Sequence, residues 1–156
     1  MMRQLRYVLA TGFGSGLSPW VPGTMGTLMA IPFYLLLTPL PWMMYLMVVL
    51  LALVGGIGLC DAVSKDLGVH DDGRIVWDEM VGYWLTMFLA PVGWVWIVAG
   101  FLLFRVFDVL KPWPISFVDE HVAGGLGIML DDVLAAMAAW GVLQIMVLIV
   151  FFVPKG

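Results

Sequence analysis

Long apolar segments alternate along the chain with short stretches that carry most of the charged residues. The apolar segments cover about 28–37, 42–59, 80–90, 94–107 and 131–153. A helix needs about 20 apolar residues to cross the hydrocarbon of a bilayer, so 28–37 and 80–90 are too short to cross unaided. The pattern predicts an all-α integral membrane bundle of about four to five hydrophobic helices.

Composition supports this fold class. The 156 residues are 63% hydrophobic and only 12% charged, with a mean hydropathy of +1.05. Soluble domains are about half apolar and a quarter charged. We therefore expect a single membrane-embedded domain over residues 1–156. No block of basic residues is present, which argues against a nucleic acid partner. The N-terminal apolar patch is too short for a signal-peptide core, so we expect this segment to be retained.

The polar stretches are predicted to share one face of the membrane. They cover 1–27, 61–79 and 105–132, and charge-free turns at 38–41 and 91–93 separate the apolar segments between them. If each segment crosses, the polar stretches meet on the same side. Every Lys and Arg except Lys155 lies in them, so the positive-inside rule makes that side cytoplasmic.

Residues 11–26 are rich in Gly, Ser, Thr and Pro. We expect a loop here, because Pro19, Pro22 and Gly23 disfavour a regular element. Thr24 or Thr27 is then a candidate cap for the helix that follows. Near the other end of the chain, Pro112 is expected to end a helix at about Lys111.

Arg105, Asp108 and Lys111 lie three residues apart where an apolar helix should leave the membrane. On a helix they project within an arc of roughly 120°. Ionisable groups are costly in a bilayer, so this basic-acidic-basic face suggests a functional site. The alternative is an Arg–Asp pair with ordinary flanking cations.

Carboxylates gather in the same polar stretches: Asp78, Glu79, Asp108, Asp131 and Asp132. Oxygen ligands without thiolates suit a hard cation such as Mg²⁺. Acids at a helix start are also common without a metal, because they interact favourably with the helix dipole. Asp61 and Lys65, four residues apart, are most simply a helix-end ion pair.

Arg105 and Lys111 are the candidates for binding a phosphate. Two glycine-rich runs that precede apolar segments, at 22–24 and 124–127, could add backbone N–H groups. An oxyanion site, a metal and a carboxylate base together favour phosphoester hydrolysis or transfer.

Four ordered motifs carry a family resemblance: PGTMGT (22–27), IVWDEMVG (75–82), FRVFDVLKPWPI (104–115) and GGLGIMLDD (124–132). Together they resemble the phosphatidylglycerophosphatase A family, small lipid phosphatases of the bacterial inner membrane. The resemblance covers about residues 10–140. The first motif ends in Gly26-Thr27, where many relatives are expected to have Gly-Ser. A threonine hydroxyl can make the same hydrogen bonds.

The resemblance implies Mg²⁺-dependent hydrolysis of phosphatidylglycerophosphate to phosphatidylglycerol and phosphate, in phospholipid synthesis. It implies a multi-pass protein of the bacterial inner (plasma) membrane with its active site facing the cytoplasm. No obligate protein partner is implied. Water is the expected nucleophile with one carboxylate as base, and a phospho-aspartyl intermediate is the alternative.

The predicted site combines these residues in three roles. The catalytic set is Asp78, Glu79, Asp108, Asp131 and Asp132. The metal ligands are Glu79, Asp108, Asp131 and Asp132. The phosphate-binding set is Arg105, Lys111, Thr24 and Gly23.

Two other functions fit the sequence less well. A CDP-alcohol phosphotransferase also uses clustered aspartates, but its spaced motif is not found here as a single run. A non-enzymatic small transporter subunit predicts charges near the middle of the bilayer. The charges of this chain gather at segment ends instead.

Overall fold

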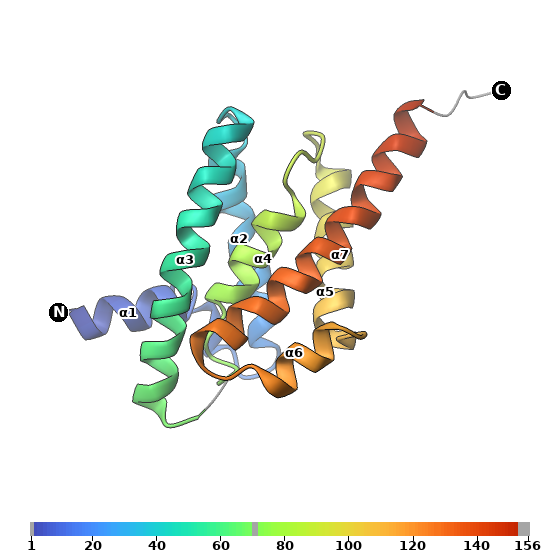
Figure 1. The fold of residues 1–156 in the computed structure, drawn as a ribbon. Helices are drawn as coiled ribbons and strands as arrows, with labels where there is room; N and C mark the ends of the chain where they lie inside the picture. Colours follow the sequence, from blue (N-terminus) through green and yellow to red (C-terminus); the bar gives the residue numbers. More distant parts are fainter. Residues whose placement is uncertain (1, 70–71, 153–156) are drawn as a thin grey trace.

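The computed structural model describes residues 2–69 and 72–152, and every regular element within these ranges is a helix (Figure 1). This confirms the all-α prediction. The helices are α1 (Met2–Ala10), η1 (Ser15–Leu17), α2 (Pro22–Leu37), α3 (Trp42–Leu67), α4 (Trp77–Thr86), α5 (Trp94–Leu110), α6 (Ile115–His121) and α7 (Gly124–Phe152).

Two helices, α3 and α7, are long and apolar enough to cross a membrane. They have 26 and 29 residues. At 1.5 Å per residue these lengths correspond to about 39 and 43 Å, more than the roughly 30 Å of a bilayer core. Most residues in their apolar windows are not buried by the rest of the protein, so these helices can present apolar surface to lipid.

The short predicted apolar segment 80–90 begins inside α4, the central helix of the bundle. Here α4 has only ten residues, and seven of them are buried. It packs against α2, α3, α5 and α7. Tyr83 and Met80 are fully buried, and Trp84 donates its indole N–H to the carbonyl of Ala30 on α2 at 2.9 Å. The short segment is therefore covered by protein.

The loop predicted over 11–26 is only partly correct, because α2 already begins at Pro22. Proline suits the first position of a helix, where its missing N–H leaves no hydrogen bond unmade. Val21 is the N-cap and makes no side-chain capping bond. The capping predictions for Thr24 and Thr27 were therefore wrong. Thr27 instead donates its hydroxyl to the carbonyl of Gly23 at 2.9 Å.

The predicted end of the helix before Pro112 is confirmed. Here α5 ends at Leu110, and Lys111 is its C-cap in the left-handed conformation with φ of 42°. The predicted pair on α3 is also found, with Lys65 Nζ 2.7 Å from Asp61 Oδ2.

One end of the bundle, which we call the polar end, holds the helix termini at Pro22, Leu67, Trp77, Leu110 and Gly124. The turns from α2 to α3 and from α4 to α5 lie at the opposite end (Figure 1). The chain reversals therefore bring distant charged segments together, as the sequence pattern predicted. Lys155, the exception in the charge pattern, lies outside the described residues.

The run Gly124–Gly127 forms the first turn of α7 and packs closely on α3. The N–H of Gly125 donates to Asp61 Oδ1 at 3.3 Å. A Cβ atom on Gly125 would lie 2.0 Å from the carbonyl oxygen of Ile57. The glycines therefore allow the two long helices to approach each other.

We predict that Gly125→Ala destabilises the protein, because its methyl group would meet backbone atoms of α3 that cannot rotate away. Overpacking of this kind costs about 1–3 kcal/mol. Gly141→Ala on the same helix is the control, since a Cβ there meets nothing within 4 Å. Thermal unfolding in detergent should show a lower midpoint for Gly125→Ala and an equal or higher one for Gly141→Ala. Equal midpoints for the two variants would contradict the close-packing role.

Candidate active site

A cavity of about 290 Å³ lies at the polar end. It brings together eight of the nine residues that the sequence predicted for the site. The lining residues are Pro22, Gly23, Gly73, Ile75, Asp78, Glu79, Arg105, Asp108, Val109, Lys111, Asp131 and Asp132. Thr24 is the predicted residue that does not line it. The run Gly124–Gly127 also lies outside the lining, where it contacts Asp61.

Three carboxylates form the acidic part of the cavity. Asp78 and Glu79 come from the first turn of α4, and Asp132 comes from α7. One oxygen from each of the three lies within 4.8 Å of the others. Glu79 Oε2 and Asp132 Oδ2 are buried and accept no hydrogen bond from the described residues. Burial raises the pKa of Glu79 to about 8, and the nearby charges of Asp132 and Asp108 add to the rise.

Such a group of buried oxygens is stable only with bound protons or a positive partner, because like charges at this separation repel strongly in a poorly solvated cavity. A divalent cation supplies that charge and prefers oxygen ligands. The donor set of Asp78, Glu79 and Asp132 therefore fits a hard metal ion.

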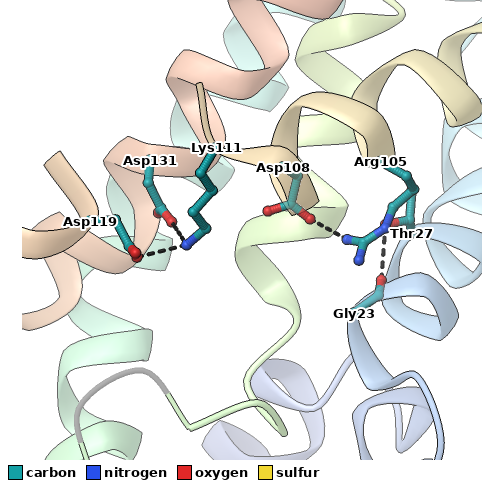
Figure 2. Close-up of polar contacts among 7 residues, drawn as sticks. All are labelled: Gly23, Thr27, Arg105, Asp108, Lys111, Asp119 and Asp131. Atoms are coloured by element: carbon teal, nitrogen blue, oxygen red, sulfur yellow. Dashed lines mark hydrogen bonds and ion pairs between the residues drawn. The ribbon is translucent and has the colours of Figure 1, made fainter. Parts of the chain in front are cut away.

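Two cations, Arg105 and Lys111, line the same cavity, and each forms ion pairs with neighbouring carboxylates (Figure 2). Arg105 forms an ion pair with Asp108, one turn away on α5. Both side chains are largely buried, with 17% and 11% exposed. The Nε atom of Arg105 is also buried, and it has no hydrogen-bond partner among the described residues.

Lys111 bridges α6 and α7. Its Nζ lies 2.6 Å from Asp119 Oδ1 and 2.7 Å from Asp131 Oδ2 (Figure 2). Burial opposes the charged ammonium, but these two hydrogen bonds outweigh it and raise the pKa of Lys111 above its ordinary value. Asp119 is a residue of this cluster that was not among the predicted site residues. The sequence feature that could have indicated Asp119 is the proline-containing reversal at 112–114, because it directs the following acids back toward Lys111.

The first turn of α2 completes the cavity. A Cβ atom on Gly23 would lie 2.5 Å from Glu79 Oε1 and 3.2 Å from both terminal nitrogens of Arg105. Glycine at this position therefore lets an acid and a cation lie against the same helix turn. The first N–H groups of a helix have no acceptor within it, and the dipole is positive at this end. The start of α2 thus adds favourable surroundings for an anion.

The comparisons with known proteins agree with the motifs. The sequence profile of the family described as Phosphatidylglycerophosphatase A matches residues 8–147. The chain belongs to this family. The protein is therefore a phosphatase. No solved structure matches the chain.

Three relatives show the extent of the similarity. The Phosphatidylglycerophosphatase A of Escherichia coli K12 is 54% identical over 138 residues, covering 88% of this chain and 80% of the relative. The Haemophilus influenzae protein of the same name is 47% identical, covering 85% and 83%. A Bacteroides thetaiotaomicron protein, provisionally named a phosphatidylinositol-3-phosphatase, is 42% identical, covering 85% and 87%.

We predict that Gly23→Ala lowers phosphatase turnover far more than it lowers stability. Its methyl group would push apart the ends of Glu79 and Arg105, and a shift of about 1 Å at a reacting site can cost about a hundredfold in rate. Gly73→Ala is the matched control, because Gly73 also lines the cavity but its Cβ would meet only Pro22, at 3.9 Å. Phosphate release and thermal unfolding would be measured for both variants. Equal rates for Gly23→Ala and Gly73→Ala would remove Gly23 from the site.

Proposed function

We propose that the protein hydrolyses phosphatidylglycerophosphate to phosphatidylglycerol and inorganic phosphate, as a step in phospholipid synthesis. The observation that carries this proposal is a single cavity in which buried carboxylates face Arg105 and Lys111 at one end of an apolar helix bundle. A lipid phosphomonoester has matching chemistry, with a charged phosphate and apolar tails. The names of the Escherichia coli and Haemophilus influenzae relatives support this substrate.

Magnesium is the proposed cofactor, held by Asp78, Glu79 and Asp132. The buried oxygens of Glu79 and Asp132 that accept no hydrogen bond from the described residues support this assignment. When bound, a magnesium ion polarises a phosphoryl oxygen and offsets charge in the transition state. Asp108 and Asp131 each contact a cation, so we assign them first to positioning Arg105 and Lys111. Their role as metal ligands stays a prediction.

The cations are proposed to bind the phosphate. Arg105 uses one edge to contact Asp108 and keeps its buried Nε available. Lys111 is fixed between Asp119 and Asp131. Preorganised donors of this kind stabilise the charge that builds on phosphate oxygens during transfer. Gly23 contributes its backbone N–H from the start of α2, and the phosphate-binding role of Thr24, which does not line the cavity, stays a prediction. A carboxylate of the acidic group accepts the proton of the attacking water.

The proposed location is a bacterial inner membrane, crossed more than once, with the cavity on the cytoplasmic side. The lengths of α3 and α7 support spanning. The cations of the described helices gather toward the polar end, and the positive-inside rule favours the cytoplasm for such an end. A cavity at this level lies in the headgroup layer, where the phosphate of a lipid is found. This arrangement requires no protein partner.

The direct test is phosphate release by the purified protein from phosphatidylglycerophosphate in detergent micelles. We expect release with Mg²⁺, loss of release with EDTA, and recovery when excess Mg²⁺ is returned. Phosphatidylinositol 3-phosphate is the comparison substrate, because it is named for the Bacteroides thetaiotaomicron relative. If folded protein releases no phosphate from phosphatidylglycerophosphate, the proposal is refuted. If phosphatidylinositol 3-phosphate is turned over faster, it replaces phosphatidylglycerophosphate as the proposed substrate.

We also predict that Asp132→Asn separates metal binding from folding. The substitution removes one charge from a buried acidic group, so the metal-free variant should unfold at the same temperature as the wild type or higher. Mg²⁺ should raise the unfolding temperature of the wild type through binding to the folded state. In Asp132→Asn that rise should vanish. Turnover should fall by more than about tenfold, because even residues that only support a metal ligand cost at least about tenfold when they are replaced.

Glu120→Gln is the control for this experiment, since Glu120 is an exposed acid that does not line the cavity. It should keep both the Mg²⁺-dependent rise and the turnover. An unchanged response to Mg²⁺ in Asp132→Asn would exclude Asp132 as a ligand.

A further inference from the structure

One face of α5 is apolar and exposed along its whole length. Val95, Val98, Leu102, Val106 and Val109 recur at intervals of three and four residues and are all exposed. This spacing places them on a single face of the helix. The buried residues of α5 point the other way, into the bundle. The exposed face, which we call the α5 stripe, therefore forms a continuous apolar surface parallel to the helix axis.

The α5 stripe ends at the cavity. Val109 lines the cavity together with the charged residues, yet 67% of its surface is exposed. Arg105 precedes Val109 by four residues, so the two side chains are neighbours on the surface of α5. The cavity thus has an apolar border that is open to the outside, next to the guanidinium proposed to bind phosphate.

The neighbouring helix α2 also has exposed apolar residues near its start. α2 packs beside α5 and begins with Pro22 and Gly23, which line the cavity. One and two turns further along α2, Met25 and Leu28 are exposed. Neither Met25 nor Leu28 lines the cavity, so α5, through Val109, supplies the exposed apolar border next to the charged residues.

We propose that the acyl chains of a lipid phosphomonoester lie along the α5 stripe while its phosphate enters the cavity sideways, past Val109. This inference rests on the proposed function. It adds the route by which the phosphate enters the cavity and the surface that recognises the acyl chains. A charged headgroup and an apolar tail match the two surfaces that meet at Val109. Covering the tail keeps its apolar surface out of water, which favours binding in proportion to the area covered. A water-soluble phosphomonoester lacks that contribution.

Another apolar hollow, between α4 and α7, is a weaker candidate for the tail. It is lined by Leu85, Phe88, Ala136, Met137 and Trp140. None of these residues lines the charged cavity. A lipid whose phosphate contacts Arg105 therefore has a direct apolar continuation along α5 and not into this hollow.

The first experiment maps the tail by photo-crosslinking. The full protein in bilayer nanodiscs would be exposed to phosphatidic acid that carries a diazirine on one acyl chain. Phosphatidylcholine with the same labelled chain reports ordinary lipid contact. We expect the phosphatidic acid probe to give several-fold more labelling of residues 98–109 than of the exposed α3 face at 47–54. Identical labelling patterns for the two probes would overturn the proposal.

This measurement needs binding of a lipid phosphomonoester and no turnover. It therefore distinguishes the two ideas. Absence of phosphate release from phosphatidylglycerophosphate would refute the proposed function, whereas the labelling pattern alone decides whether the α5 stripe holds the tail.

The second experiment compares Val109→Asn with Val69→Asn, an exposed valine at the polar end that does not line the cavity. The ratio of kcat/KM for a lipid phosphomonoester to kcat/KM for its deacylated, water-soluble form would be measured. We expect the ratio to fall about tenfold in Val109→Asn, which corresponds to about 1.4 kcal/mol, and to stay at the wild-type value in Val69→Asn. Equal losses for both substrates in Val109→Asn would overturn the role in tail recognition.

Discussion

Mutual repulsion among buried carboxylates is the constraint on which the arrangement of this protein depends. Asp78, Glu79 and Asp132 bring three acidic groups into one poorly solvated space, and such groups are stable together only with positive charge or bound protons. Arg105 and Lys111, at the end of α5, supply part of that positive charge. The helix start at Pro22 adds a partial positive charge. The polar ends of α2, α4, α5 and α7 therefore each contribute to one electrostatic balance.

The central helix α4, which carries two of these acids, is short and mostly buried. With ten residues it can place Asp78 and Glu79 at the cavity while the rest of the helix is covered. The surrounding helices supply the apolar contacts that a ten-residue helix cannot provide for itself.

Much of this architecture follows from the sequence. The apolar segments, the end of α5 at Pro112 and the convergence of the charged stretches depend on hydropathy, proline chemistry and chain reversal, which are local or periodic signals. Eight of nine site residues line one cavity for that reason. The start of α2 was misplaced because Pro22-Gly23 suits both a turn and the first turn of a helix.

Other features depend on contacts between distant segments. The contact of Asp119 with Lys111 requires the reversal at 112–114 and the docking of α6 on α7. Asp78, Glu79 and Asp132 form a group that suits a metal ion, whereas Asp108 and Asp131 form ion pairs with cations. This division likewise depends on which side chains face each other in the folded chain. The run Gly124–Gly127 resembles an anion-binding loop in sequence, yet it packs on α3 because two backbones approach there.

The contact between Asp61 and Gly125 has a mechanical consequence. It joins the two long helices near the polar end, so a change in their tilt pivots about that point. Asp131 and Asp132 follow Gly125 by only six and seven residues, about 10 Å along the axis. Helices adjust to bilayer thickness mainly by tilting. A change in tilt therefore moves the far ends of α3 and α7 through the larger distance, while Asp131 and Asp132, close to the pivot, move least.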